Sequence, residues 1–183
     1  GPNGTLEGKA AGNQDIFIDL GEAPCEDIWT NFTPAAAITK ARPSGIVNGI
    51  YYGQDGTSVT LCTYAASSKA AARHVFLLGD MTDWQLSNDY QLYRDGNYFW
   101  IELTGLTKGQ EYRFQYAIER ADGKHVQISD LFSEKLIHPD DRYEPRTLDP
   151  DLITYPRCGA DGGYITVIQP GKPAYQWSDA TLN

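Results

Sequence analysis

Cysteine is scarce in this sequence of 183 residues, which contains only Cys25, Cys62 and Cys158. They form no C-x-x-C pair, their spacing is wide and their number is odd. Zinc-type metal binding is therefore disfavoured, and the sequence assigns no disulfide pairing. The three histidines are equally scattered and show no ligand spacing. We expect neither a metal nor another cofactor.

Long apolar runs are also missing. No run reaches the roughly 18 residues that a membrane-spanning helix needs, so we expect no membrane-spanning segment. The start shows no charged region followed by an apolar one, so any export signal would already have been removed. Sustained helical periodicity is absent as well. A TIM barrel needs roughly 250 residues of alternating strands and helices, and neither requirement is met.

Basic residues are in the minority, with 15 Lys and Arg against 24 Asp and Glu and a net charge of −9. This balance disfavours a nucleic-acid partner and anionic lipids, and it suits an uncharged ligand. Aromatic residues, in contrast, are abundant, with 12 Tyr, 6 Phe and 4 Trp. Most of them fit the core of a β-protein, and the alternative is a stacking surface for a neutral ligand such as a sugar.

Short β-rich runs alternate with turn signals along the middle of the chain. The clearest run is 111–118, where Tyr, Phe and Ile at even positions alternate with more polar residues, so that one face is apolar and the other wetter. The expected strands are 15–20, 46–52, 58–64, 74–78, 90–93, 97–103, 111–118, 126–128 and 163–168. This pattern predicts an all-β, immunoglobulin-like antiparallel β-sandwich with irregular extensions at both ends.

We divide the chain into three parts. Residues 1–41 comprise a tag remnant, a linker and an N-terminal arm with one short strand. Residues 42–137 form the sandwich. Residues 138–183 are a proline-rich extension followed by a connector to a catalytic domain that the sequence does not contain.

The run Val75–Trp84 (VFLLGDMTDW) is the most informative motif: a strand ends in Gly-Asp, turns through small polar residues and closes on Trp. It is followed by Gly96–Trp100 (GNYFW) and Leu106–Phe114 (LTKGQEYRF). In order and spacing these motifs resemble the N-terminal β-sandwich domains of glycoside hydrolase family 13, classed as carbohydrate-binding module family 48. Such domains precede the barrel in branching enzymes, isoamylases and pullulanases.

Further segments extend the resemblance over about residues 42–177. The segments 42–46 (RPSGI), 128–136 (ISDLFSEKL) and 164–177 are similar to α-amylase-type enzymes of gut Bacteroidetes, where they come directly before the catalytic barrel. The resemblance implies an exported protein, periplasmic or at the cell surface. It also implies that this fragment is a non-catalytic accessory domain of a starch-degrading enzyme, supporting the catalytic domain of the same chain.

The resemblance gives two candidate carbohydrate-binding residues. Trp84 occupies the position of the family's stacking tryptophan, and Arg113 a position where sugar-binding members often carry Lys. Such members place a second Trp around 123–127, where this chain has none. Trp84 is therefore either a sugar contact or a packing residue. Trp100 is expected to face outward, opposite to Phe99 and Ile101, as a ligand platform or an interdomain contact.

Catalysis by this fragment is not expected. The sequence contains no Gly-x-Ser-x-Gly, no phosphate loop and no zinc motif, and a thin sandwich rarely brings two carboxyls together across a cleft. Two other functions remain open. One is a free-standing module that binds α-glucan such as starch, glycogen or maltooligosaccharide. The other is a purely structural or protein-interaction sandwich, which is favoured if Trp84 is buried.

Overall fold

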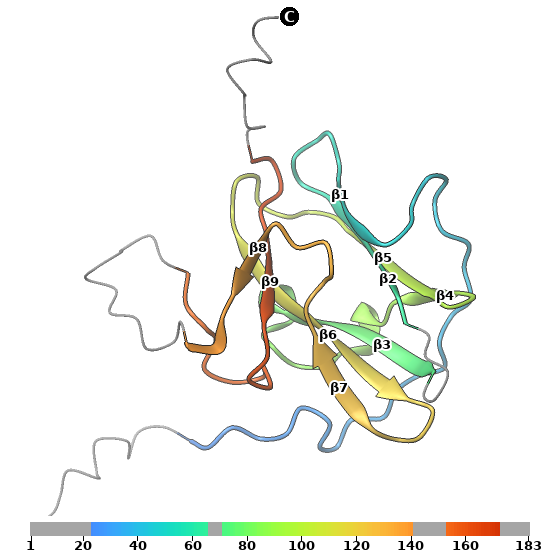
Figure 1. Ribbon diagram of the computed structural model, residues 1–183, viewed down its shortest axis with the longest axis vertical. Helices are drawn as coiled ribbons and strands as arrows, with labels where there is room; N and C mark the ends of the chain where they lie inside the picture. Colours follow the sequence, from blue (N-terminus) through green and yellow to red (C-terminus); the bar gives the residue numbers. More distant parts are fainter. Residues whose placement is uncertain (1–22, 66–70, 141–152, 173–183) are drawn as a thin grey trace, which may run out of the picture.

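The computed structural model describes residues 23–65, 71–140 and 153–172, which form two antiparallel β-sheets packed face to face (Figure 1). No α-helix occurs within these ranges. The first sheet has the order β1 (Gly49–Tyr52), β2 (Val59–Tyr64), β5 (Tyr98–Leu103), β4 (Tyr93–Asp95). The second has the order β3 (Ala72–Gly79), β6 (Tyr112–Arg120), β9 (Ile165–Ile168), β8 (Lys135–Ile137), with β7 (His125–Ile128) also paired with β6. The predicted antiparallel β-sandwich is confirmed.

Most expected strands appear within a few residues of their predicted bounds. The hairpin predicted at 90–103 is the β4–β5 pair, and its turn contains Gly96 at a φ of +63°, a backbone conformation that glycine adopts without steric cost. β8 was not predicted, because it is only three residues long and two of them are exposed. The strand expected at 15–20 lies outside the described residues.

The main core lies between the two sheets. The alternation predicted for β6 places Tyr112, Phe114, Tyr116 and Ile118 on its inner face, where they join core residues of β2 and β5 such as Leu61 and Phe99. The stretch before β4 links the sheets, since Gln91 bridges Phe76 of β3 while Tyr93–Asp95 pairs with β5. The stretch from Gln91 to Asp95 therefore closes one side of the sandwich.

A second apolar layer covers the outer face of the sheet that contains β3, β6 and β9. Phe76 and Leu78 of β3 point into it. The segments that cover this face are the arm, the loop after β3 and the stretch around 153–160, which contribute Ile28, Trp29, Phe32, Trp84, Leu86, Ile153, Tyr155 and Ala160. The face of β6 expected to be wetter is therefore buried. Gln115 on that face is 0% exposed, and its amide donates to the Tyr164 carbonyl oxygen at 2.9 Å.

The N-terminal arm is fixed to the sandwich at both ends. A disulfide joins Cys25 to Cys158. Further along, Thr39 forms a parallel bridge with Arg94 of β4, and the Arg42 guanidinium is 2.8 Å from the Asp95 carboxylate. In Figure 1 the blue arm passes below the β6–β7 hairpin and then rises along β4. The arm is thus part of the folded body, although it contains no strand of its own between residues 23 and 41.

No helix among the described residues is both long and apolar enough to cross a lipid bilayer.

Candidate functional site

Trp84 lies at the end of the loop after β3, which begins with the 3₁₀ turn η2 (Asp80–Thr82). Asp83 and Trp84 both have left-handed backbone conformations, with φ of +55° and +56°. Such conformations are unfavourable for a bulky side chain and persist only where surrounding contacts hold them. Here they turn the indole back onto the outer face of the sheet, and Trp84 is 8% exposed. The ring is a packing element of the second apolar layer.

Asp80 brings Trp84 and Arg113 together. Its Oδ1 accepts a hydrogen bond from the indole Nε1 at 3.0 Å and another from the Arg113 guanidinium at 2.8 Å. Its Oδ2 accepts from the Arg113 backbone N–H, also at 2.8 Å. The guanidinium Nε also donates to Oδ2, at 3.1 Å, and Nη1 donates to the Thr154 carbonyl oxygen at 2.7 Å. Each nitrogen of the guanidinium therefore already has an acceptor within the chain.

The segment after the disulfide closes over Trp84. Gly159 has a φ of +99°, and a Cβ at this position would lie 2.6 Å from the Trp84 Cβ and 2.8 Å from its carbonyl oxygen. Such separations are far below van der Waals contact. Glycine is required at this position both by the backbone conformation and by the close approach.

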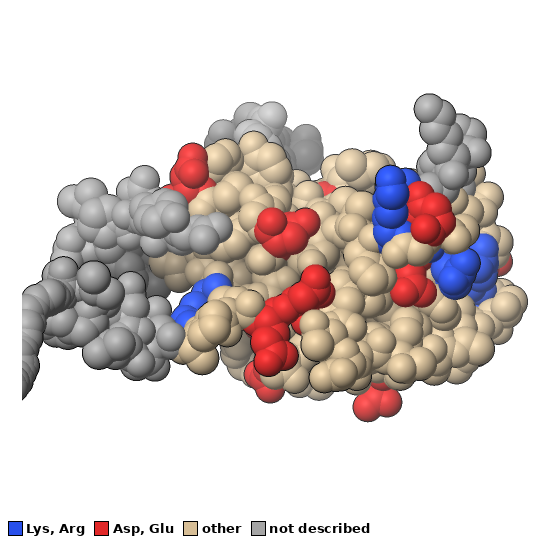
Figure 2. Space-filling view, turned by 90° about the horizontal axis from the view of Figure 1, so that it is seen from below, with Lys and Arg blue, Asp and Glu red and all other residues tan. Residues whose placement is uncertain are grey.

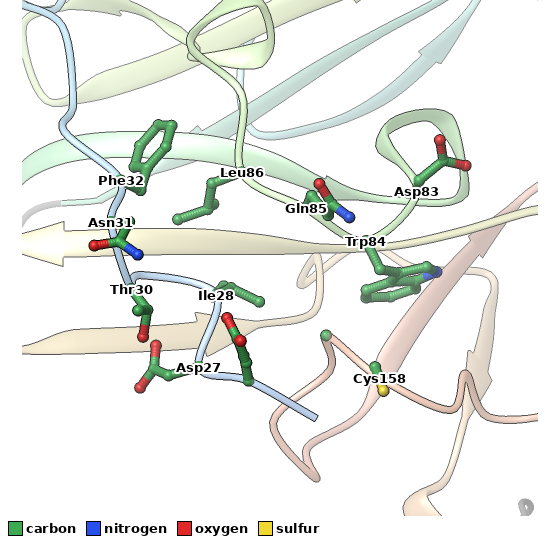
Figure 3. Close-up of a pocket in the computed structure, with 12 residues that line it drawn as sticks. Asp27, Ile28, Thr30, Asn31, Phe32, Asp83, Trp84, Gln85, Leu86 and Cys158 are labelled. Carbon is green, nitrogen blue, oxygen red and sulfur yellow. The ribbon is translucent and has the colours of Figure 1, made fainter. Parts of the chain in front are cut away.

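A cavity of about 510 Å³ opens beside Trp84, between the arm and the loop after β3 (Figure 3). Phe32, Leu86 and Ile28 form a row of apolar side chains, and the indole lies beyond them near Cys158. Among the described residues, the charged groups in the lining are the carboxylates of Glu26, Asp27 and Asp83, and none of these lining residues is Lys, Arg or His. The cavity offers hydrogen-bond acceptors and the amides of Asn31 and Gln85 around an apolar floor.

Figure 2 views the molecule from below, the side along which the arm runs. Acidic side chains lie spread over the middle of this face, while several Lys and Arg side chains gather toward one end beside further acidic ones and another basic side chain lies near the opposite end. This distribution agrees with the net charge of −9.

Trp100 lies apart from this cluster, on the outer face of the other sheet. Trp100 lies on the outer face of its strand, as the alternation predicts. The residue is nevertheless only 4% exposed, because the arm covers it. Its Nε1 donates to the Lys40 carbonyl oxygen at 2.9 Å, and the Lys40 ammonium lies 5.5 Å from the ring centroid. The tilted ring of Tyr93 completes the contact at 4.9 Å. The partner of Trp100 is this chain's own arm, which sequence alternation alone does not reveal.

The structure also identifies Trp29 of the arm as a contact residue, which the sequence analysis did not single out. Its ring stacks on His125 of β7, with centroids 3.8 Å apart and planes within 3°. The His125 Nε2 lies 3.1 Å from a carboxylate oxygen of Glu119. His125 belongs to the 123–127 region, which contains no tryptophan. In this chain the arm covers that region.

Comparison with protein-family models gives no match, and comparison with curated proteins gives none either. Within the described ranges, no group of three or more His, Cys, Asp or Glu side chains is arranged to hold a metal ion.

Proposed function

We propose that this chain is a non-catalytic accessory domain of an exported, α-amylase-type enzyme that degrades starch or related α-glucans. In this proposal the domain supports the enzyme by packing against its catalytic domain, and it does not bind glucan at Trp84. The order and spacing of the motifs across residues 42–177 support the accessory role. The main support for packing is that Trp84 and Arg113, the residues at the family's sugar-contact positions, both donate hydrogen bonds to Asp80.

Sugar recognition needs an open aromatic face for the apolar side of the ring and free polar groups for the hydroxyls. Trp84 is 8% exposed and the Arg113 side chain 21%. The region of the missing second tryptophan is covered by the arm through Trp29. A glucan would have to displace these contacts, and the free energy of doing so would be subtracted from binding.

The Cys25–Cys158 disulfide supports the export part of the proposal. Disulfides form and persist in oxidising compartments such as the periplasm and the cell exterior, and they are rare in the cytosol.

A second function, glucan binding by the domain itself, is favoured by one observation. The cavity beside Trp84 has a volume of about 510 Å³, within the roughly 300–1,000 Å³ of typical small-molecule sites. A sugar in this cavity would contact Trp84 together with Phe32 and the amides of Asn31 and Gln85.

Calorimetric titration with maltoheptaose and β-cyclodextrin distinguishes the two functions. For the accessory role we expect no heat at millimolar sugar from the wild-type chain. Trp84→Phe, which keeps an aromatic ring but loses the indole N–H, and Trp84→Ala should lower only the stability. Binding by the wild type that is lost in a folded Trp84→Ala variant would replace the accessory role with a glucan-binding module.

The parent enzyme provides the second test. Deleting this domain should lower the unfolding temperature of the catalytic domain while leaving its activity on short maltooligosaccharides measurable. A parent protein without any amylolytic activity would contradict the proposal.

A further inference from the structure

The turn between β7 and β8 is fixed to the second sheet by a buried carboxylate. Asp130 is 4% exposed. Its Oδ2 accepts from the Tyr116 hydroxyl at 2.7 Å, and its Oδ1 accepts from the Phe132 backbone N–H at 2.8 Å. The Asp130 N–H in turn donates to the Thr166 hydroxyl at 2.7 Å, and the Ser133 hydroxyl donates to the Asp130 carbonyl oxygen at 2.6 Å. The backbone of this turn is therefore fixed in place.

The side chains that this fixed turn presents are large, apolar and exposed. Leu131 is 85% exposed and Phe132 is 56% exposed. On the neighbouring edge strands, Leu136 of β8 is 46% exposed and Tyr52 of β1 is 41% exposed. Because the backbone of the turn is already fixed, a partner that covers Leu131 and Phe132 would not have to order this backbone, and exposed apolar groups of this kind are suited to docking.

A cavity of about 240 Å³ lies between this turn and β1. Its walls include Phe132, Tyr51 and Tyr52, and among the described residues that line it Glu134 is the one with a charge. Glu134 is exposed and has no ion pair with any residue of the described ranges. We call this cavity the Phe132 pocket.

Glu134 lines the same cavity as the aromatic residues. The pKa of the Tyr52 hydroxyl is raised, first by burial and also by the negative charge of Glu134. The hydroxyl itself is engaged, since it accepts the Gln169 backbone N–H at 3.0 Å. Tyr52 therefore contributes its ring to the pocket and Glu134 contributes the charge.

Aromatic faces next to a single carboxylate favour a cation. The pocket is smaller than the roughly 300 Å³ at which small-molecule sites begin, so it suits one amino-acid side chain. Between the two basic side chains, the planar guanidinium of arginine stacks on rings and pairs with carboxylates in two-point geometry, whereas lysine offers a strongly hydrated point charge.

We propose that the Phe132 pocket receives an arginine side chain from a partner protein, while Leu131 and Leu136 pack against the apolar surface around that arginine. The charge complementarity between Glu134 and a basic side chain identifies the partner's chemistry, and the exposed leucines identify the partner as a protein surface. This inference goes beyond the accessory-domain proposal, since it requires a protein partner but neither a glucan nor a catalytic domain.

A two-dimensional NMR titration of the 183-residue chain with N-acetyl-arginine methylamide tests the pocket. The neutral isostere N-acetyl-citrulline methylamide serves as the control ligand. We expect the arginine derivative to shift the amide signals of Tyr52, Phe132 and Glu134, and the citrulline derivative to leave them unchanged. Equal shifts with both ligands, or arginine shifts confined to the arm carboxylates Glu26 and Asp27, would overturn the proposal.

Two variants separate the charge from the ring. Glu134→Gln should weaken binding about threefold, the size of a typical exposed ion-pair contribution. The matched variant Glu102→Gln, at an exposed carboxylate on β5, should bind like the wild type. Phe132→Ala should also weaken binding, and its unfolding temperature should change little because the hydrogen bonds to Asp130 do not involve the ring. Wild-type affinity in either Glu134→Gln or Phe132→Ala would refute the proposal.

Discussion

Removing the Cys25–Cys158 disulfide is the perturbation that best tests how the arm is held. The bond joins positions 133 residues apart, one in the arm and one in the segment that closes over Trp84. A cross-link of this kind restricts the unfolded chain, which otherwise gains the entropy of a long open loop. The double variant Cys25→Ser/Cys158→Ser removes the cross-link with a small change in side-chain volume.

The magnitude follows from the loop length. With the separation of 133 residues, the chain-entropy expression gives a loss of about 5 kcal/mol at 25 °C. Measured losses for native disulfides are about 2–5 kcal/mol. Even the lower figure is a large share of the roughly 5–15 kcal/mol by which a domain of this size is stable. The arm should remain docked after reduction, because Trp29, Phe32 and the Arg42–Asp95 pair still hold it.

Urea unfolding followed by Trp fluorescence and by circular dichroism measures this loss. Oxidised wild type, wild type reduced with a phosphine, and the double variant should form a series in which the last two agree. Cys62 provides an internal check on thiol counting, since burial raises its pKa to about 11 and it should not react with iodoacetamide in the native state at pH 8. A loss below about 1 kcal/mol, or a separate early transition of the arm, would refute the entropic reasoning.

Three further predictions concern single positions. Asp80→Asn removes the charge that holds Arg113 and should cost about 2 kcal/mol of unfolding free energy, measured by the same urea titration; an unchanged midpoint would contradict the role of this cluster. Gly159→Ala should cost about 2–4 kcal/mol, because the new methyl group meets Trp84 and the backbone has a positive φ; Gly162→Ala, where a Cβ meets nothing within 4 Å, is the control for the positive φ alone. Burial raises the pKa of Tyr116 well above 10, so the folded state keeps a proton that the unfolded chain loses above about pH 10, and stability should fall with rising pH in that range. Tyr116→Phe should flatten this alkaline slope, and a slope equal to that of the wild type would contradict the assignment.

The strands could be predicted from the sequence because their signals are local. The alternation in 111–118 identified the inner face of β6, and the Gly96 turn identified the β4–β5 hairpin. Both depend on neighbouring residues along the chain. β8 was missed since three residues with an exposed Lys135 and Leu136 carry no such pattern.

The candidate site could be predicted only in part, because its contacts join distant segments. The motif around Trp84 and the polar position of Arg113 were visible in the sequence. The role of Asp80 between them depends on a contact across 33 residues, and the pairing of Cys25 with Cys158 depends on one across 133. Gln115 illustrates the general difficulty: a polar residue on a strand face indicates solvent unless the layer that covers it is already known.

The second apolar layer has a consequence for dissecting this protein into fragments. A truncated chain that starts at residue 42, where the sandwich motifs begin, would retain every strand of both sheets. It would also lack Ile28, Trp29 and Phe32 of the second apolar layer, and Phe76 of β3 would lose the two aromatic rings of the arm that pack against it. Such a fragment should self-associate and be poorly soluble despite its complete set of strands. Any transplantation of this sandwich into another protein should therefore carry the arm with it.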